Sequence, residues 1–485
     1  MCVLQLRWGT CKKIEQMKTQ LLIAIIFTTS LTVYGQTTFQ KTYGGTGNDF
    51  GLSVQQTTDG GYILFGHTSS FGSGGQDMYL IKTDDQGNEQ WSQTYGGTNF
   101  EFGVSAQQTT DGGYILCGGY SGLVNDSLAL IKTDSSGNEV WNKRYSGTID
   151  RDVGQFVQQT SDGGFIAVGF TGPSFTEHIY MVKTDIHGNE QWSKVHVSNG
   201  REYAAGVRQT SDGGYAMIGA TNSTGFGGKD MFLVKTNSTG DTTWTKTYGT
   251  SSDEIGRSLY ITTDNGFILL GYEDSVGGNL FLVKTDVFGN EQWSNYYGGT
   301  GWDMGHSVQQ TSDGGYILVG RKQNTTGGTN DMYCIKTNNA GGVEWSYSYP
   351  RGIMSDANSV QQTTDGGYIL LGSTTDTVGG INSDMYLVKI NGLGLVSFYY
   401  NDLPTLNVLA YPNPFTEHTT IELNDSKNRE FSMTLLNSQG QIIMSINNIT
   451  AGQIRIERDN LASGLYFFQI STGGQFVAAG KLIIK

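Results

Sequence analysis

One four-residue motif, D-G/N-G-Y/F, returns along this chain at intervals of 49 to 52 residues. Its seven copies begin at Asp59, Asp111, Asp162, Asp212, Asp264, Asp313 and Asp365. A tryptophan series keeps the same period, at Trp91, Trp141, Trp192, Trp244, Trp293 and Trp345. Such a repeat limits the fold strongly, because each unit must form one supersecondary structure that packs on its neighbours.

Each unit reads as four short strands. In the first unit they are expected at Leu52–Thr57, Gly61–Thr68, Asp77–Thr83 and Glu89–Tyr95. The two middle segments are apolar on both faces, which is typical of buried strands. The first turn, D-G-G, and the third, D-x-x-G-N, contain glycine, which enters positive φ at no steric cost. The 70 glycines of the chain therefore indicate many tight turns.

Four antiparallel strands repeated seven times predict a seven-bladed β-propeller over residues 36–390. The segment Phe39–Tyr43 (FQKTY) is similar to the Trp-bearing strand Trp244–Tyr248 (WTKTY). We expect it to complete the seventh blade by pairing with Asp384–Ile390. Leu395–Tyr400 in that place would contradict this model of ring closure.

The N-terminal region has the layout of a secretory signal. An apolar run, Leu21–Phe27, follows Lys18 and is followed by small and polar residues. The run is too short to span a bilayer. We expect residues 1–35 to be a signal region that is cleaved between Gly35 and Gln36. Within it, Met17 is the expected true start of the protein. An uncleaved anchor is the alternative, and no transmembrane segment is expected in the mature chain.

The formal net charge of −14 argues against nucleic acid as a partner, since phosphates require a basic surface. Of the four cysteines, Cys2 and Cys11 would leave with the signal. Cys117 and Cys334 lie in apolar strand segments of distant repeats and are interpreted as small buried hydrophobes.

The two ends of the predicted ring differ. Turns one and three are short and nearly invariant, whereas the second connection and the link between units are long and individual. Loops on a rigid scaffold commonly carry binding sites, so the variable end is the expected functional face.

Each link carries one acidic residue: Asp49, Glu101, Asp152, Glu202, Glu254, Asp303 and Asp356. These acids predict either a carboxylate ring that holds a cation or a polyol, or carboxylates that accept N–H groups of their own loops. Residues that no architectural need explains are further ligand candidates: Trp302, Phe100, Tyr203, Phe226, Arg201 and Arg351.

Known catalytic patterns are missing from the sequence. The six histidines have no metal-ligand spacing, and no nucleophile elbow, P-loop or dinucleotide fingerprint occurs. The run Asp84–Trp91 resembles the tryptophan-docking motif of quinoprotein propellers, but with no counterpart of their cofactor site. We therefore expect no catalytic residue, no metal and no cofactor.

After Ile390 the repeat stops. Residues 391–404 are interpreted as a linker, and residues 405–485 show alternating strands that predict a small antiparallel β-sandwich. These strands are expected at Thr419–Leu423, Phe431–Leu436, Gln441–Ile446, Gln453–Glu457, Leu465–Ile470 and Phe476–Lys485. The fold class predicted for the whole chain is all-β.

Four ordered motifs make the tail more specific. They are YPNPF from Tyr411, NSQGQ from Asn437, ASGLYF from Ala462 and the terminal KLIIK. The tail resembles the type A sorting domain of the type IX (Por) secretion system. The positions that carry the resemblance are Pro412, Asn413, Pro414, Phe415, Gly440, Gly464, Leu465 and Tyr466.

This resemblance implies a route. A type IX protein of Bacteroidota reaches the periplasm, is recognised through its tail by the outer-membrane translocon, and loses the tail to a sortase-like peptidase. It is then secreted or attached to the outer cell surface. The seven repeats also resemble Gly-rich propeller repeats of exported proteins in such bacteria. Three loops match a short O-glycosylation pattern of that phylum, at Ser127, Ser275 and Thr377.

The function expected from these features is that of an exported, non-catalytic β-propeller that binds a glycan or protein, as in adhesion. Two alternatives stay open. One is a secreted polysaccharide-degrading enzyme that uses a pair of carboxylates at the variable end. The other is a structural protein of the cell surface.

Overall fold

A computed structural model describes residues 37–121, 126–147, 151–173, 176–275, 277–324, 329–375, 382–396, 407–424, 429–437, 442–472 and 475–485. The described residues form strands and contain no helix, so the described part of the chain is all-β. The expected signal region, with Gly35 and Gln36, lies outside the described residues, as do Gly440 and Thr377.

The first five repeats each form one four-stranded antiparallel sheet. The first sheet contains β2 (Asp49–Gln56), β3 (Tyr62–Thr68), β4 (Asp77–Thr83) and β5 (Glu89–Tyr95); the second contains β6 (Phe100–Gln108), β7 (Tyr114–Ser121), β8 (Ser127–Thr133) and β9 (Glu139–Tyr145). The third contains β10 (Asp152–Gln159), β11 (Phe165–Thr171), β12 (His178–Thr184) and β13 (Glu190–His196); the fourth contains β14 (Glu202–Gln209), β15 (Tyr215–Thr221), β16 (Asp230–Thr236) and β17 (Thr242–Tyr248). The fifth contains β18 (Glu254–Ile261), β19 (Phe267–Glu273), β20 (Leu280–Thr285) and β21 (Glu291–Tyr297).

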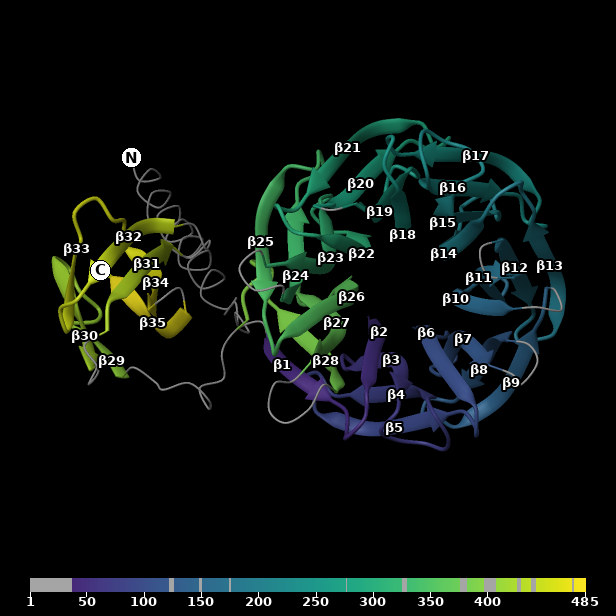
Figure 1. Cartoon of the computed structure of the whole chain (residues 1–485). Helices are drawn as coiled ribbons and strands as arrows, with labels where there is room; N and C mark the ends of the chain where they lie inside the picture. The colour runs from purple at the N-terminus through teal and green to yellow at the C-terminus, as the bar shows by residue number, and fades with distance from the viewer. Residues whose placement is uncertain are drawn as a thin grey trace, which may run out of the picture. The chain divides into compact units, whose positions relative to one another are not determined.

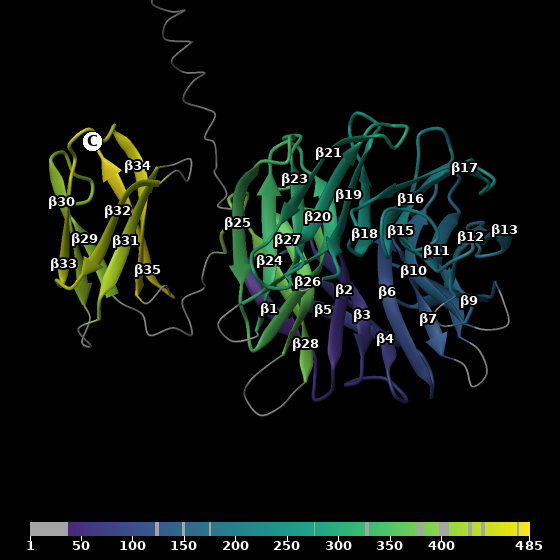
Figure 2. The same cartoon turned by 45° about the horizontal axis from the view of Figure 1, so that its top comes forward.

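The last two repeats follow the same plan. The sixth contains β22 (Met304–Gln310), β23 (Tyr316–Gln323), β24 (Asn330–Thr337) and β25 (Val343–Tyr349), and the seventh contains β26 (Met354–Gln362), β27 (Tyr368–Thr375) and β28 (Ser383–Ile390). A single parallel bridge between Asn330 and Met354 joins these two sheets. The sheets are arranged around a central opening (Figure 1), and their strands run between its two ends (Figure 2).

The fourth strand of the seventh sheet comes from the N-terminus. β1 (Phe39–Tyr43) pairs antiparallel with β28, from Phe39 opposite Lys389 to Tyr43 opposite Met385. This confirms the pairing that the similarity between FQKTY and WTKTY predicted. The first and last repeats are thereby held by backbone hydrogen bonds as well as by side chains.

Apolar layers between neighbouring sheets form the core. The middle strands β3 and β4 are buried along almost their whole length, because both of their faces meet other sheets. On the outer strand, Trp141 packs edge-on against Phe165 of the next repeat, with ring centroids 5.9 Å apart. Phe39 of β1 packs in the same way against Tyr62, at 6.0 Å. Each outer strand therefore fastens its sheet to the following one.

A tyrosine at the end of the outer strand adds a polar contact between repeats. Tyr145 donates its hydroxyl hydrogen to the carbonyl of Gly188 in the next repeat, at 2.6 Å. Tyr43 of β1 donates to the carbonyl of Gly87, also at 2.6 Å. The N-terminal strand thus reproduces the contacts that the Trp-bearing strands make elsewhere.

The innermost strands of all seven repeats surround a channel of about 640 Å³. Each of these strands contains an irregularity in its pairing, such as the register shift between Gly256 and Ser258 in β18. A bulged residue is left out of the strict alternation of the strand. In this protein the bulged residue, Arg257 in β18, lines the channel.

The tail forms two further sheets. One contains β29 (Asn407–Tyr411), β30 (His418–Asn424) and β33 (Gln453–Glu457), and the other contains β31 (Phe431–Asn437), β32 (Ile442–Ile449), β34 (Gly464–Thr472) and β35 (Gln475–Ile484). Both sheets contribute to one core that includes Ile421, Leu435, Ile456, Phe468 and Ile470. β29 was not among the expected strands.

The YPNPF motif fastens the start of the tail to its last strand. Asn413 donates through its side-chain amide to the Lys481 carbonyl at 2.7 Å and accepts from the Ile483 N–H at 2.8 Å. The backbone N–H of Phe415 donates to Ile483 O at 2.9 Å, and the Phe415 side chain is buried. Two of the motifs singled out in the sequence therefore form one structural unit.

Two further observations concern single residues and segments. Cys117 and Cys334 are free and fully buried, as the apolar segments around them predicted, and burial raises the pKa of both thiols. Within the described part of the chain, no helix is long and apolar enough to cross a membrane.

Candidate functional site

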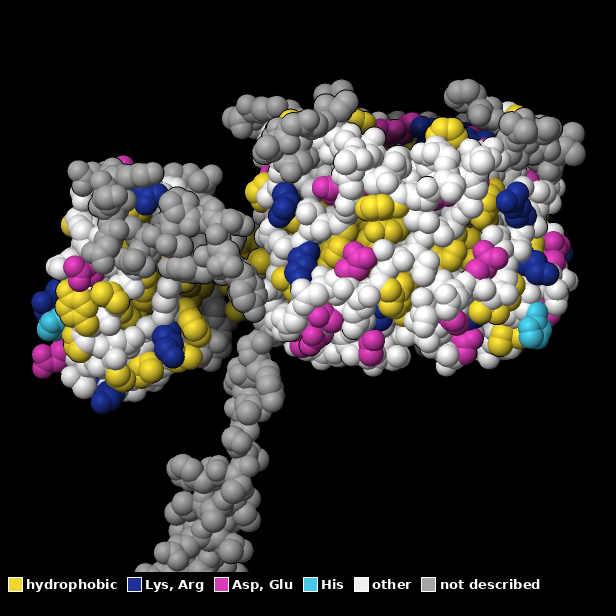
Figure 3. All heavy atoms as spheres, turned by 90° about the horizontal axis from the view of Figure 1, so that it is seen from below, with side chains coloured by type: hydrophobic (Ala, Val, Ile, Leu, Met, Phe, Trp, Pro, Cys, Tyr) yellow, Lys and Arg dark blue, Asp and Glu magenta, His cyan; other side chains and the backbone are white. Residues whose placement is uncertain are grey.

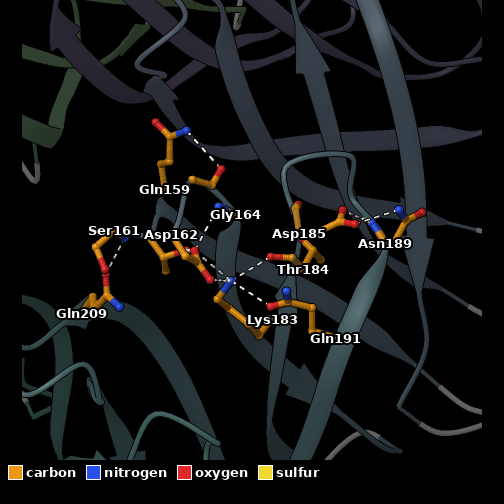
Figure 4. A network of polar contacts seen from close by, with 12 residues as sticks. Gln159, Ser161, Asp162, Gly164, Lys183, Thr184, Asp185, Asn189, Gln191 and Gln209 are labelled. Carbon is orange, nitrogen blue, oxygen red and sulfur yellow. Dashed lines mark hydrogen bonds and ion pairs between the residues drawn. The ribbon is translucent and has the colours of Figure 1, made fainter.

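The end of the ring that carries the invariant turns, hereafter the uniform end, contains one polar network per repeat. In the third repeat Lys183, whose side chain is 4% exposed, pairs with Asp162 at 2.9 Å and also donates to Thr184 O and Gln191 Oε1 (Figure 4). Asp162 in turn accepts from the Gly164 N–H within the turn. The same ion pair, at 2.8 to 2.9 Å, joins Lys82 to Asp59, Lys132 to Asp111, Lys235 to Asp212, Lys284 to Asp264, Lys336 to Asp313 and Lys389 to Asp365.

This network sets the charge of the turn. Burial alone would raise the pKa of Asp162, but hydrogen bonds from Thr160 and Lys183 outweigh it and hold the pKa below its ordinary value. Because the Asp stays ionised, the buried ammonium of Lys183 keeps its partner. The motif D-G-G-Y/F with its lysine is therefore explained by architecture.

Glutamines on the channel wall hold neighbouring repeats together. Gln158 Oε1 accepts from the Gln209 N–H at 2.8 Å, and Gln209 Oε1 accepts from the Ser161 N–H, also at 2.8 Å. Gln361 Oε1 accepts in the same way from Gln56 N of the first repeat, at 2.6 Å. The fourth and fifth repeats depart from this pattern, with Arg208 and Tyr260 at the position of the first glutamine.

At the opposite, variable end, most link acids are buried and bonded within their own loops. Asp303 accepts from Gly299 N at 2.7 Å and Gln323 N at 2.8 Å, and Asp49 accepts from Gly45 N at 2.8 Å. Glu101 accepts from Gly97 N at 3.1 Å, and Glu254 accepts from Thr250 N at 3.0 Å. These contacts are the loop-capping role that the sequence left open beside ligand binding.

The remaining members of this set differ in detail. Glu202 contacts His196 Nδ1 at 2.7 Å and accepts from Thr221 Oγ1 at 3.0 Å. The hydrogen bond to Glu202 raises the pKa of His196, whereas burial raises the pKa of Glu101 and of Glu254. Asp152 is fully buried in the equivalent place on β10.

In the seventh repeat the sequence predicted Asp356 as the link acid, but the equivalent position is one residue earlier, at Ser355. Asp49 lies opposite Thr68 and Asp152 opposite Thr171, and in the seventh repeat Ser355 lies opposite Thr374. Ser355 is buried and exchanges hydrogen bonds with the backbone of Arg351, so it takes the capping place. Asp356 is the next residue along β26, where side chains point to the other face. Burial raises its pKa, and the charge of Arg321 opposes that shift.

The ligand candidates outside the repeat pattern do not form one group. Phe100 is 59% exposed at the start of β6, and Phe226 is 70% exposed. Arg351 is exposed, with its guanidinium 5.6 Å from the centroid of Tyr386. Trp302 lies under the guanidinium of Arg321, at 4.8 Å.

Arg201 and Tyr203, in contrast, lie in one hollow of about 250 Å³ at the variable end. Its other lining residues are Gln155, Phe170, Glu177, Lys229 and Arg257. Arg201 is paired with Glu177 at 2.7 Å and Lys229 with Asp253 at 3.3 Å. Arg257 and Gln155 also line the central channel, so the hollow and the channel share residues.

Sequence reasoning missed Arg257 and Arg208. Both lie on innermost strands and line the channel, next to His306 and Tyr260. An alignment of the seven units would have marked them, because Arg208 replaces a glutamine of the Q-Q-T pattern and Arg257 stands where other units have Leu52, Val104 or Asn358. The feature that identifies Arg208 and Arg257 in the sequence is therefore a difference between repeats and not a motif.

The expected glycosylation and sorting residues are placed as follows. Ser127 begins β8 opposite Tyr120, and Ser275 follows β19 in the second connection of its repeat. In the tail, Gly464 and the 40% exposed Leu465 begin β34, while Tyr466 is buried and donates to Ala462 O. Among the described residues, no group of three His, Cys, Asp or Glu side chains is placed to hold a metal ion.

The end of the chain has a counterpart among known protein families. Residues 409–485 match the family model of the secretion system C-terminal sorting domain. This match supports an exported protein, secreted or attached to the outer surface, that interacts with the type IX secretion machinery. A search of curated proteins gave no significant match for the chain.

Solved structures of similar shape are distant in sequence. A polysaccharide lyase, Uly1, is 13% identical, with 75% of this chain and 94% of that chain covered and a TM-score of 0.45. A fungal alcohol oxidase of the AA5 family, in complex with copper, is 12% identical, with 92% and 98% covered and a TM-score of 0.44. A protein of unknown function from Dyadobacter fermentans is 10% identical, with 73% and 98% covered and a TM-score of 0.44. At these scores the likenesses carry no argument about activity.

Proposed function

We propose that this chain is an exported, non-catalytic β-propeller that binds a glycan or protein at its variable end, as an adhesin or a capture protein does. The match of residues 409–485 to a sorting domain supports the export half of this proposal. We assign residues 1–35 as a signal peptide, residues 391–404 as a linker and residues 405–485 as the sorting domain, in a protein of Bacteroidota.

The body, in this proposal, is a closed ring of seven blades. Closure is supported by the pairing of β1 with β28 and by the bond from Gln361 to Gln56 between the last and first repeats. A closed ring leaves no sheet edge for non-specific association. It also fixes the variable loops on a rigid frame, which suits recognition.

The observation that carries the binding function is the hollow beside the channel mouth. It combines aromatic rings, from Phe170 and Tyr203, with basic groups from Arg201, Lys229 and Arg257. Convergent polar groups beside apolar faces are typical of ligand sites. Asp49, Glu101, Glu254 and Asp303, by contrast, accept hydrogen bonds within their loops, which gives a glycosidase role of these acids no support.

Two experiments test the two halves of the proposal. Expression in a type IX-competent host should place the full chain at the surface or in the medium, and a chain lacking residues 407–485 should stay in the periplasm. A glycan array and a pull-down with the exported protein should return a ligand whose binding is lost when Tyr203 is replaced by Ala. An unchanged location of the truncated chain, or no ligand from either screen, would contradict the respective half.

A further inference from the structure

The channel differs in charge from the rest of the molecule. The whole chain has a formal net charge of −14, and acidic side chains are spread over the outer wall of the ring (Figure 3). Within the described part of the chain, however, the residues that line the channel include no Asp or Glu. Its charged groups are the guanidiniums of Arg208 and Arg257. An acidic protein therefore encloses a cationic channel.

Both guanidiniums have unused hydrogen-bonding capacity. A guanidinium carries five N–H donors. The Nη2 of Arg257 donates to the Tyr272 hydroxyl at 3.2 Å, and its Nε is buried with no acceptor in the described part of the chain. The Nη1 of Arg208 donates to Val207 O at 3.1 Å, while the guanidinium lies 4.4 Å from the ring centroid of Phe156.

These groups stay charged at neutral pH. Burial lowers the pKa of Arg208 only to about 10. Burial and the neighbouring charge of Arg257 lower the pKa of His306 to about 4, so the imidazole adds no charge of its own near pH 7. Both arginines are partly buried. Their fixed guanidinium forks match the two oxygens of a carboxylate or a sulfate ester.

The hollow supplies the second half of a sugar site. Arg201 and Lys229 are already neutralised by Glu177 and Asp253, so Arg257 is the cation of this hollow without a carboxylate partner in the described structure. Tyr203 and Phe170 line the same hollow, with the guanidiniums of Arg201 and Arg151 at 5.8 and 5.3 Å from their respective ring centroids. An apolar ring face next to a guanidinium is suited to one charged sugar unit and poorly suited to a small inorganic ion.

We propose that Arg257, with Arg208 deeper in the channel, binds the anionic group of an acidic polysaccharide whose sugar ring packs on Tyr203 and Phe170. The anionic group is a uronate carboxylate or a sulfate ester. This inference rests on the proposed binding function and names the ligand class for it. Entry of the acid group satisfies the guanidinium donors that the fold leaves unused.

The test is a binding titration of the purified full chain with three polymers: polygalacturonate, dextran sulfate and uncharged dextran. We expect one or both charged polymers to bind, weakening at high salt, and dextran not to bind. The Arg257→Gln variant should bind roughly 10 to 100 times more weakly, because a charge-assisted bidentate contact is lost. Arg257→Lys should lie between Arg257→Gln and the unmodified chain.

Two controls keep the outcome unambiguous. Arg144→Gln, on the outer strand β9, removes the same charge away from the channel and should bind normally. Thermal unfolding checks that each variant is folded. Equal binding by Arg257→Gln and the unmodified chain, or binding of inorganic sulfate without either polymer, would overturn the inference. Retained binding of a neutral glycan or a protein would overturn it while leaving the proposed function intact, whereas no ligand in any screen would overturn both.

Discussion

The two ends of the ring use carboxylates in opposite ways. At the uniform end Asp111, Asp212 and Asp264 each pair with a buried lysine, and hydrogen bonds overcome burial to hold their pKa values at about 2. At the variable end burial raises the pKa of Glu101 and Glu254, which cap loops through backbone N–H groups. Glu202 is the exception there, because its hydrogen bond with His196 outweighs burial and lowers its pKa. The uniform end thus stabilises the folded chain, whereas the variable end forms loops around a hollow.

In this repeat protein, recurring and exceptional polar groups have different roles. A polar group that recurs in every unit is explained by the unit, as the seven Lys–Asp pairs are. Arg208 and Arg257 break the pattern, and the described residues that line the channel with them include no carboxylate. Departures from the repeat therefore point to the site more reliably than the repeated acids do.

The largest effect is expected for Phe39→Ala. Phe39 is 5% exposed, packs on Tyr62 and lies against the turn at Gly87, so its truncation leaves a cavity where β1 joins the ring. We expect a loss of about 3 to 4 kcal/mol in the free energy of unfolding. Phe100→Ala at the variable end, where the ring is 59% exposed, should cost less than about 0.5 kcal/mol. Urea denaturation measures both losses. Equal losses would show that packing at β1 stabilises the chain no more than Phe100 does at the variable end.

A smaller effect is expected for Asp162→Ala. The substitution leaves the buried ammonium of Lys183 without its ion-pair partner, although Asp162 itself is about half exposed. We expect a cost of about 2 kcal/mol. The matched variant in the preceding repeat, Asp126→Ala, removes an exposed ion pair with Arg151 and should cost less than about 1 kcal/mol. A larger loss for Asp126→Ala in the same denaturation series would show that the variable end also stabilises the fold.

The smallest effect is the dependence of stability on pH. A depressed folded pKa, as for Asp212, stabilises the protein above the unfolded pKa of about 3.9, and this contribution is lost as pH falls towards about 2. The raised folded pKa of Glu254 has the opposite effect. Ionised Glu254 destabilises the folded chain near neutral pH, so lowering the pH towards the ordinary pKa of a glutamate increases the free energy of unfolding.

The depressed pKa of His306, about 4, has a larger effect, because the unfolded chain takes up a proton below about pH 6.5 that the folded chain does not. Urea midpoints should therefore fall from about pH 6.5, with Glu254 opposing the fall, and should fall further below about pH 4. Asp212→Asn should flatten the fall below about pH 4, and Glu254→Gln should steepen the fall at higher pH. Identical pH profiles for the two variants would mean that the two ends do not differ in their electrostatics.

The fold could be read from the sequence because its signals are local and repeated. Glycine turns, apolar middle segments and the likeness of Phe39–Tyr43 to the outer strands are visible without any long-range information. The strand β29 was missed because it forms by pairing with β30. Asn413 of the YPNPF motif forms hydrogen bonds with Lys481 and Ile483 of the last strand. Tertiary contacts therefore explain a motif that could be recognised in the sequence but not explained from it.

The site was harder to predict for a physical reason. Strict alternation of strand faces cannot place Arg257, because the bulge between Gly256 and Ser258 changes which residue lines the channel. The same kind of slip, by one residue, separates Ser355 from Asp356 in the seventh repeat. A register error of one residue exchanges the two faces of a strand, so side-chain roles are lost even where the strand itself is predicted correctly.

We infer that the repeated charges stabilise the ring and the exceptional ones bind the ligand. Two variants measured in two assays test this directly. For Asp162→Ala and Arg257→Gln we would determine the free energy of unfolding and the affinity for the charged polymer. We expect Asp162→Ala to be destabilised and to bind normally while folded, and Arg257→Gln to be as stable as the unmodified chain and to bind weakly. Loss of stability without loss of binding in Arg257→Gln would contradict this inference.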